Sequence, residues 1–307
     1  MTGNALAPAG FVEGERYLAA CWAPATRRAY AADVRDYQRW GGVIPASAEE
    51  IIAYVTARAA CLRVPTLRRR LVGIGMAHVL AGHPDPTKGV LVHKVLRGVQ
   101  RVHGLRQRQA WPITMDEVLR MCEGWEGPAM LRDRALLMLG FSAALRRSEL
   151  VALDVEDLGF VAAGLTVRLR RSKTDPFGKS RLIGVPRGTG PACTVAAVRA
   201  WLAHAAIDDG AVFRRVLRSG RIGARLSDQS VNLLIKRHAA AIGLPVERIS
   251  GHSLRAGFVT AAVRAGASLV SIQRQTGHAS LDMLARYIRE MDPFACNAHA
   301  ALSRLGP

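Results

Sequence analysis

The first third of the chain repeats its apolar positions with the period of an α-helix. Thr26 is placed to cap a segment in which large side chains recur every three or four residues up to Gly41-Gly42: Tyr30, Val34, Tyr37 and Trp40. Ser47 and Glu50 have the spacing of a capping box and predict the start of a second helix. Over residues 11–103 the pattern predicts helices alone, at about 26–40, 48–61, 66–80 and 88–102.

Helical spacing continues in the second half of the chain, with one interruption. A capping box at Thr114 and Glu117 predicts one helix start, and a strongly apolar helix is expected at about 130–141. The next helix is expected to carry Arg146 and Glu149 one turn apart, on the same face. Further helices are predicted at about 191–206, 227–241, 252–265, 268–276 and 280–290.

The interruption is a change of period from helical to alternating. Leu165–Arg170 and Arg181–Val185 alternate as half-buried strands do, and the turn signal Asp175-Pro-Phe-Gly lies between them. This pattern predicts a β-hairpin with Lys173 near its tip. The expected fold is therefore mainly α with a small antiparallel β-sheet.

The 307 residues are enough for two domains. Residues 104–112 have no apolar periodicity and end in proline, which predicts a linker. We expect a helical bundle at 1–103 and a second domain, with a C-terminal tail, at 113–307.

The excess of positive charge in both predicted domains indicates a polyanionic partner. The chain carries 43 Lys and Arg against 24 Asp and Glu, a net charge of +19, and both halves are basic. A polyanion that contacts both domains fits this balance, because each neutralised phosphate releases counterions. Arginines clustered in the predicted bundle are the expected contacts to the DNA backbone: Arg27, Arg28, Arg68, Arg69, Arg70, Arg97 and Arg101.

The sequence shows no sign of a zinc site, a disulfide framework, a membrane-spanning helix or a secretory signal. Five widely spaced cysteines without a Cys-x-x-Cys pair fit neither a zinc site nor a disulfide framework, so no metal is expected. No run of 18 apolar residues and no secretory signal pattern occurs. We therefore expect a soluble cytoplasmic protein, associated with the nucleoid and not with a membrane.

The candidate chemistry comes from a few basic side chains and one tyrosine. Their order is Arg146, Lys173, the His252-Ser-Leu-Arg255 motif, Gly277-His278 and finally Tyr287, nine residues after His278. Cations and imidazoles of this kind can neutralise a phosphodiester, and a phenol can attack it. Arg147 and Lys179 are the rival candidates for the first two positions. Tyr287 lies roughly 120° from the apolar stripe of its helix, as 3.6 residues per turn implies, so its ring is expected to project to one side.

This set of residues resembles the tyrosine recombinase (phage integrase) family, and looser likeness extends to the N-terminal half. In the Arg146 motif the family often has glycine where this chain has Ala144. The resemblance implies an integrase-type DNA breaking–rejoining domain preceded by a core-binding domain. Arg146 and Arg255 would hold the scissile phosphate of double-stranded DNA with Glu149 in support, and His252 and His278 would assist. Lys173 would protonate the leaving oxygen.

By the same resemblance, Tyr287 would form a 3′-phosphotyrosyl intermediate without metal, ATP or other cofactor. The tail would dock on a neighbouring protomer in a homotetramer on synapsed DNA, with a monomer or dimer in free solution. Two alternatives stay open from the sequence. A type IB topoisomerase uses the same chemistry on one duplex, and a DNA-binding protein of this fold can lack catalysis.

Overall fold

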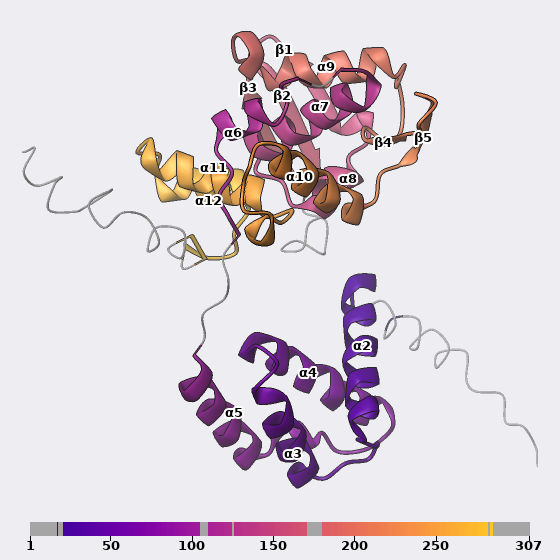
Figure 1. The fold of residues 1–307 in the computed structure, drawn as a ribbon, viewed down its shortest axis with the longest axis vertical. Helices are drawn as coiled ribbons and strands as arrows, with labels where there is room; N and C mark the ends of the chain where they lie inside the picture. The colour runs from indigo at the N-terminus through magenta and orange to yellow at the C-terminus, as the bar shows by residue number, and fades with distance from the viewer. Residues whose placement is uncertain are drawn as a thin grey trace, which may run out of the picture. The chain divides into compact units, whose positions relative to one another are not determined.

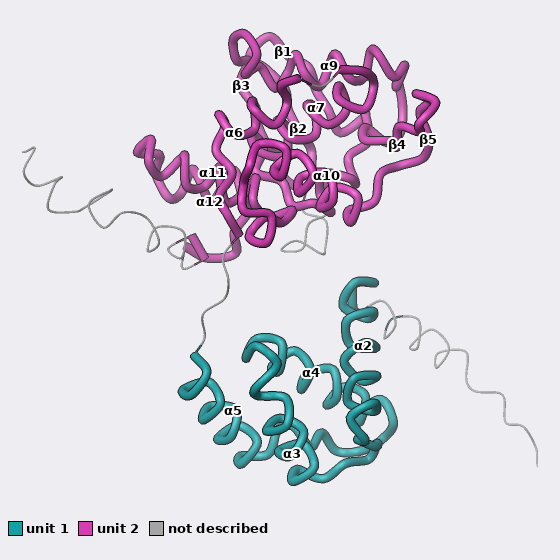
Figure 2. The backbone as a smooth tube through the Cα atoms, in the orientation of Figure 1, with its two compact units in different colours: residues 1–107 teal, residues 108–307 magenta. Residues whose placement is uncertain are grey.

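The structure is a computed structural model, and it describes residues 17, 21–104, 110–124, 126–170, 180–281, 283 and 284. The chain divides into two compact units, Met1–Gln107 and Arg108–Pro307 (Figure 2). Among the described residues, no helix combines the length and the apolarity that crossing a bilayer requires. The match to mainly helical integrase structures reported below confirms the expected fold class.

The first unit is a bundle of four helices among the described residues, with a short 3₁₀ turn (Figure 1). These are α2 (Pro24–Trp40), α3 (Ala48–Ala59), α4 (Val64–Leu80), η1 (Pro86–Lys88) and α5 (Val90–His103). The predicted capping box is present on α3, where Ser47 Oγ accepts from the Glu50 amide at 3.2 Å and the Glu50 carboxylate accepts from the Ser47 amide. The prediction that Thr26 caps α2 is wrong, because Pro24 begins that helix.

Aromatic side chains fill the centre of the bundle, and carboxylates lie beside them. Tyr37 and Tyr54 are fully buried, with ring centroids 5.1 Å apart in an edge-to-face arrangement. Asp33 is buried and accepts from Arg69 Nη1 at 2.6 Å. Arg70 is paired with Asp36, and its Nη1 donates to the Tyr54 hydroxyl at 3.0 Å. The α2 carboxylates thus tie α4 to the rest of the bundle through ion pairs.

The second unit has one hydrophobic core, to which both helices and strands contribute. Its helices are α6 (Met115–Arg120), α7 (Pro128–Ser142), α8 (Arg147–Ala152), α9 (Thr194–His204), α10 (Asp228–Ala241), α11 (Ser253–Arg264) and α12 (Leu269–Thr276). Helix α7 is buried along most of its length and packs against α9 and α11. The apolar run at 135–141 follows from this central place, and the buried Asp133 earlier in the helix is paired with Arg132 and His238.

The predicted hairpin is present as part of a three-stranded antiparallel sheet. The sheet order is β1 (Leu158–Val161), β2 (Gly164–Leu169) and β3 (Arg181–Pro186), and Leu169 pairs with Arg181 at the end that leads into the hairpin turn. The turn itself, with Lys173 and Lys179, lies outside the described residues.

Some strands were not predicted from the sequence. Strand β1 is short and only partly buried, and β4 (Arg214–Val216) and β5 (Ile222–Arg225) form a small arginine-rich hairpin. Near the end of the expected linker (104–112), the Trp111 amide donates to the Arg248 carbonyl at 2.9 Å, and Ile113, the first residue after it, is fully buried. Trp111 is thus packed onto the second unit.

Candidate active site

Arg146 is held by the start of α8. It precedes the helix as its N-cap, so it does not lie on the helical face that the sequence predicted. Glu149 accepts from the Arg146 amide at 2.8 Å and from Arg146 Nη1 at 2.6 Å. The buried Glu149 carboxylate therefore fixes both the backbone and the guanidinium of Arg146. Arg146 Nη2 lies 3.4 Å from the Gly277 carbonyl oxygen.

The turn between α7 and α8 has a left-handed residue at its centre. Ala144 has φ 51° and is fully buried, and it occupies the position where the family often has glycine. Its amide donates to the Phe141 carbonyl at 2.9 Å, and the next amide, that of Leu145, donates to the Gly140 carbonyl at 3.1 Å. The chain therefore makes this turn with the smallest side chain after glycine, and an alanine in this conformation carries a cost of about 1 kcal/mol.

Arg255 is anchored by that same turn. It lies in the first turn of α11, is fully buried, and donates from Nη1 to the Ala144 carbonyl at 2.7 Å. A carbonyl oxygen is a neutral partner, so this bond orients the guanidinium without cancelling its charge. The bond also ties the start of α11 to the residues just before Arg146.

His252 is the residue directly before α11, and the loop that carries it is fixed from α10. Asn232 Oδ1 accepts from the Gly251 amide at 2.8 Å. A side chain at Gly251 would overlap the aliphatic stem of Arg147, so glycine is needed for this close approach. His252 remains open to solvent on one side. Arg147 is thus a neighbour of His252 and packs on its loop, whereas Arg146 makes the contacts to Glu149 and Gly277.

His278 follows the left-handed Gly277 that ends α12. Its side chain is buried, and Nδ1 lies 2.7 Å from the hydroxyl oxygen of Thr276. That hydroxyl also lies 2.7 Å from the Ile272 carbonyl oxygen, so the ring is tied to the last turns of α12. Gln273 Nε2 donates to the His278 carbonyl at 3.0 Å and holds the backbone as well.

The contacts of Arg146 with the Gly277 carbonyl and of Arg255 with the Ala144 carbonyl bring these residues into one site, where their charges act on one another. Displacement of water by the surrounding protein, together with the charges of Arg255, Arg146 and Arg147, lowers the pKa of His252 to about 4. Burial, followed by the charges of Arg255 and Arg146, lowers the pKa of His278 to about 3. Both rings are therefore neutral at pH 7, beside two arginines that remain charged.

The site therefore unites four of the predicted catalytic side chains with Glu149, from segments more than a hundred residues apart: Arg146, His252, Arg255 and His278. The other two, Lys173 and Tyr287, lie outside the described residues. Three more residues support the site and were not predicted: Ala144, Arg181 and Asn232. Within the described part of the chain, no group of three or more His, Cys, Asp or Glu residues is arranged to hold a metal ion.

The arginines of the first unit that were expected to contact DNA differ in exposure and in their contacts within the unit. Arg27, Arg28, Arg97 and Arg101 are exposed. Arg69 and Arg70 are engaged with the α2 carboxylates. Arg68 is exposed and also donates to Gln100 Oε1 at 2.5 Å. Arg68 and Arg97 also line one cavity of about 480 Å³ between α4 and α5.

Comparison with known proteins agrees with this geometry. Residues 112–292 match the model of the phage integrase family. The chain is 35% identical over 299 residues to an integrase/recombinase XerD homologue of Selenomonas ruminantium, which covers 94% of this chain and 88% of the relative. It is 24% identical over 280 residues to the Cre recombinase of Escherichia phage P1, with 83% of this chain and 78% of the relative covered.

Solved structures of recombinases share the fold. The XerH site-specific recombinase bound to a palindromic difH substrate aligns with a TM-score of 0.65 at 16% identity, over 91% of this chain and 79% of that one. The confirmed points are the predicted family, the fold and the class of enzyme. The chain belongs to the phage integrase family and is a tyrosine-type site-specific recombinase that cleaves and rejoins DNA.

Proposed function

We propose that Arg146, Arg255, His252 and His278 form the binding pocket for the scissile phosphate, and that Tyr287 is the nucleophile. The proposal rests on the contacts that hold these side chains at three adjoining helix ends: Arg146 Nη2 lies 3.4 Å from the carbonyl oxygen just before His278, and Arg255, in the first turn after His252, donates to the carbonyl two residues before Arg146. Two charged guanidinium groups beside two neutral imidazoles supply the positive charge and the hydrogen-bonding groups that binding and cleavage of a phosphodiester require. The arginines stabilise negative charge on the non-bridging oxygens as it grows in the transition state.

The reaction proceeds by exchange of one phosphoester for another. The Tyr287 phenolic oxygen attacks phosphorus and loses its proton, the bond from phosphorus to the 5′ oxygen breaks, and that oxygen receives a proton from Lys173. The product is a 3′-phosphotyrosyl link and a free 5′-hydroxyl. The 5′-hydroxyl of another strand then attacks the link and releases the tyrosine. Because each step replaces one ester by another, neither ATP nor a metal ion is required.

The two histidines have complementary parts in this scheme. His252 has an exposed side and a lowered pKa, so it is neutral at pH 7 and can accept the proton of the Tyr287 phenol. His278 is buried and held by Thr276, so it has a fixed orientation next to the phosphate. A bound phosphate also raises the pKa of both rings, since a nearby negative charge favours the protonated form.

The first unit is proposed to bind double-stranded DNA on the side of its exposed arginines, as a core-binding domain. Arg27, Arg28, Arg97 and Arg101 are the favoured contacts, with Arg68 beside them. Arg69 and Arg70 take a structural part through the α2 carboxylates. The second unit then acts as the catalytic domain, and residues 104–112 are the linker that the sequence predicts.

We further propose a homotetramer on two synapsed DNA sites, with a monomer or dimer in free solution, acting on the nucleoid in the cytoplasm. Two similar proteins give support. XerH has been solved bound to its difH substrate, and phage lambda integrase as a dimer bound to a core site. Analytical ultracentrifugation with and without paired DNA sites tests the assembly.

Cleavage of a nicked DNA site by Arg255→Ala tests the phosphate pocket. At saturating DNA we expect the rate of covalent adduct formation to fall about 10²–10³-fold, as when one donor to a transition-state oxyanion is removed. Arg264→Ala is the matched control, because Arg264 is exposed at the far end of the same helix. A rate for Arg255→Ala near that of the control would rule out the pocket.

A further inference from the structure

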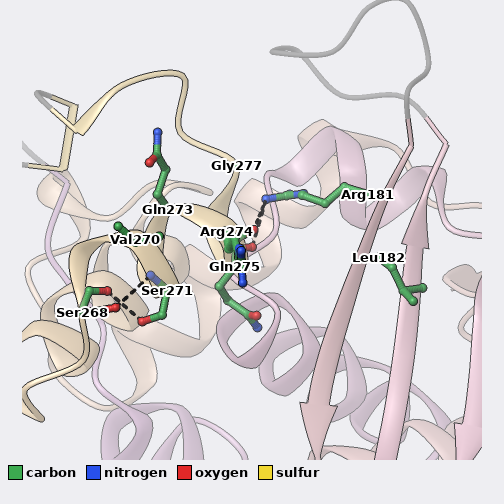
Figure 3. Close-up of a pocket in the computed structure, with 9 residues that line it drawn as sticks. All are labelled: Arg181, Leu182, Ser268, Val270, Ser271, Gln273, Arg274, Gln275 and Gly277. Atoms are coloured by element: carbon green, nitrogen blue, oxygen red, sulfur yellow. Dashed lines mark hydrogen bonds between the residues drawn. The ribbon is translucent and has the colours of Figure 1, made fainter.

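Arg181 connects the sheet to the end of α12. It is the first residue of β3 and pairs with Leu169 at the end of the ladder that leads into the hairpin turn. Its Nη1 donates to the Gln275 carbonyl at 3.0 Å and lies 3.4 Å from the Arg274 carbonyl. Figure 3 shows the side chain of Arg181 reaching from its strand to the last turn of this helix. These carbonyls have no partner within the helix, and they carry its negative dipole end.

Gly277 lies directly against this guanidinium. A Cβ at Gly277 would overlap Arg181 Nη1 and come within 2.7 Å of Cζ. The residue also has φ +63°, a left-handed conformation that favours glycine. Two independent reasons therefore require glycine immediately before His278. One of them exists only because Arg181 occupies that space.

Arg181 also lies within the electrostatic field of the active site. Burial lowers its pKa, the charge of Arg146 lowers it further, and that of Glu149 raises it. Arg181 is in turn among the charges that act on His278. Since the described residues show no carboxylate paired with it, the chain keeps a partly buried cation here, with its Nη2 atom buried, at a cost in desolvation. A contact that merely packed the sheet against α12 would not need a charged group.

We propose that Arg181 is a positioning residue for the cleavage reaction, which sets the location of His278 by clamping the α12 carbonyls and the Gly277 turn onto strand β3. This inference rests on the proposed function. Arg181 touches backbone next to His278 and none of the reacting atoms, so it acts through the histidine.

The test is a double-mutant cycle in the full-length protein. Arg181→Ala, His278→Ala and the double variant are compared in single-turnover formation of the covalent adduct on a nicked DNA site, with DNA affinity measured separately. Arg187→Ala is the control, because Arg187 is exposed directly after the same strand. Displacement of a catalytic group by about 1 Å can slow a reaction about 10²-fold. We expect that loss in Arg181→Ala and wild-type rates in Arg187→Ala, with Kd changed less than about threefold in both.

The double variant decides how Arg181 acts. If it positions His278, the double variant reacts within about threefold of His278→Ala alone, because the second change has nothing left to displace. A further 10²-fold loss in the double variant overturns the inference, as does wild-type cleavage by Arg181→Ala. Should Arg181→Ala fail to fold by circular dichroism, Arg181→Met replaces it in the same cycle, since methionine fills part of the space but donates no hydrogen bond to the carbonyls.

A second readout separates positioning from general support of the fold. The Arg181 side chain borders an open cavity of about 630 Å³, so methylguanidinium can reach the space that Arg181→Ala leaves. We expect added methylguanidinium to restore cleavage in Arg181→Ala at least tenfold and to leave Arg187→Ala unchanged; no recovery counts against the clamp. If the wild-type protein forms no adduct at all, the proposed function fails, whereas an active wild type with unimpaired Arg181→Ala refutes this inference alone.

Discussion

Acidification should destabilise the second unit through His278. The ring is buried, and its pKa in the folded chain is lowered to about 3, from an ordinary value of 6.5. The unfolded chain therefore binds a proton here below about pH 6.5, whereas the folded chain binds one only near pH 3. The stability that the neutral ring contributes is complete above pH 6.5 and falls as pH drops toward 3.

The size of the effect follows from this difference in pKa. Each pKa unit corresponds to about 1.4 kcal/mol, so the part of the interval between pH 6.5 and 4.5 gives a loss of about 2–3 kcal/mol in the free energy of unfolding. His278→Gln cannot take up this proton. We expect the wild type to lose about 2 kcal/mol more than this variant between pH 7 and 4.5.

Urea denaturation of both proteins at each pH, followed by circular dichroism, measures the difference. His204→Gln serves as the control, because His204 is exposed on α9, and it should follow the wild type. Bound DNA should reduce the loss of stability of the wild type on acidification, since the phosphate raises the pKa of the ring in the folded chain toward its value in the unfolded chain. Equal pH dependence in wild type and His278→Gln would refute the burial of a neutral imidazole at this position.

Two other sites give independent predictions. Ala144→Gly should change the free energy of unfolding by less than about 1 kcal/mol, because relief of the left-handed strain offsets the lost methyl group, whereas Ala144→Val should cost about 2–4 kcal/mol in urea denaturation. Equal stability of the two variants would contradict the left-handed turn. Arg97→Ala should weaken DNA binding and lower the slope of log K against log salt by about one, as loss of a phosphate contact does. Arg70→Ala should instead destabilise the first unit by about 1–2 kcal/mol, because it removes the ion pair to Asp36 and the hydrogen bond to the Tyr54 hydroxyl, while Asp36 keeps its contacts to Arg58 and Tyr54. A purely salt-dependent loss of DNA affinity without loss of stability would contradict that pairing.

Local features of the fold were predictable from the sequence because their causes are local. Capping boxes such as Ser47 with Glu50 satisfy backbone donors within one turn, so the residues that decide them are adjacent. The alternation of apolar and polar residues likewise predicted β2 and β3, because it is a property of neighbouring residues within each strand. Strand β1 was missed because it is short and half-buried, so it has little apolar signal. Pro24 rather than Thr26 begins α2, since proline is compatible with the first helical position.

The arrangement of the candidate site could not be predicted from local sequence in this way. Arg146, Arg255 and His278 were predicted as one set by likeness to a family, and nothing in their local sequence brings them together. The contacts that hold them are long-range, such as the bond from Arg255 to the Ala144 carbonyl. Sequence could not have indicated that Ala144 adopts a left-handed conformation, since alanine usually avoids it. The structural part of Arg70 was hidden likewise, because its carboxylate partner lies on another helix.

We propose that the cation cluster of the second unit directs the Tyr287 phenol onto phosphorus. The most direct test of this proposal is mass spectrometry of the peptide that remains attached to DNA after cleavage of a nicked site in EDTA. We expect a single peptide, modified at Tyr287 and joined to the 3′ phosphate, and no adduct with Tyr287→Phe. An adduct that survives this substitution, or one that maps to a different residue, would contradict the proposal.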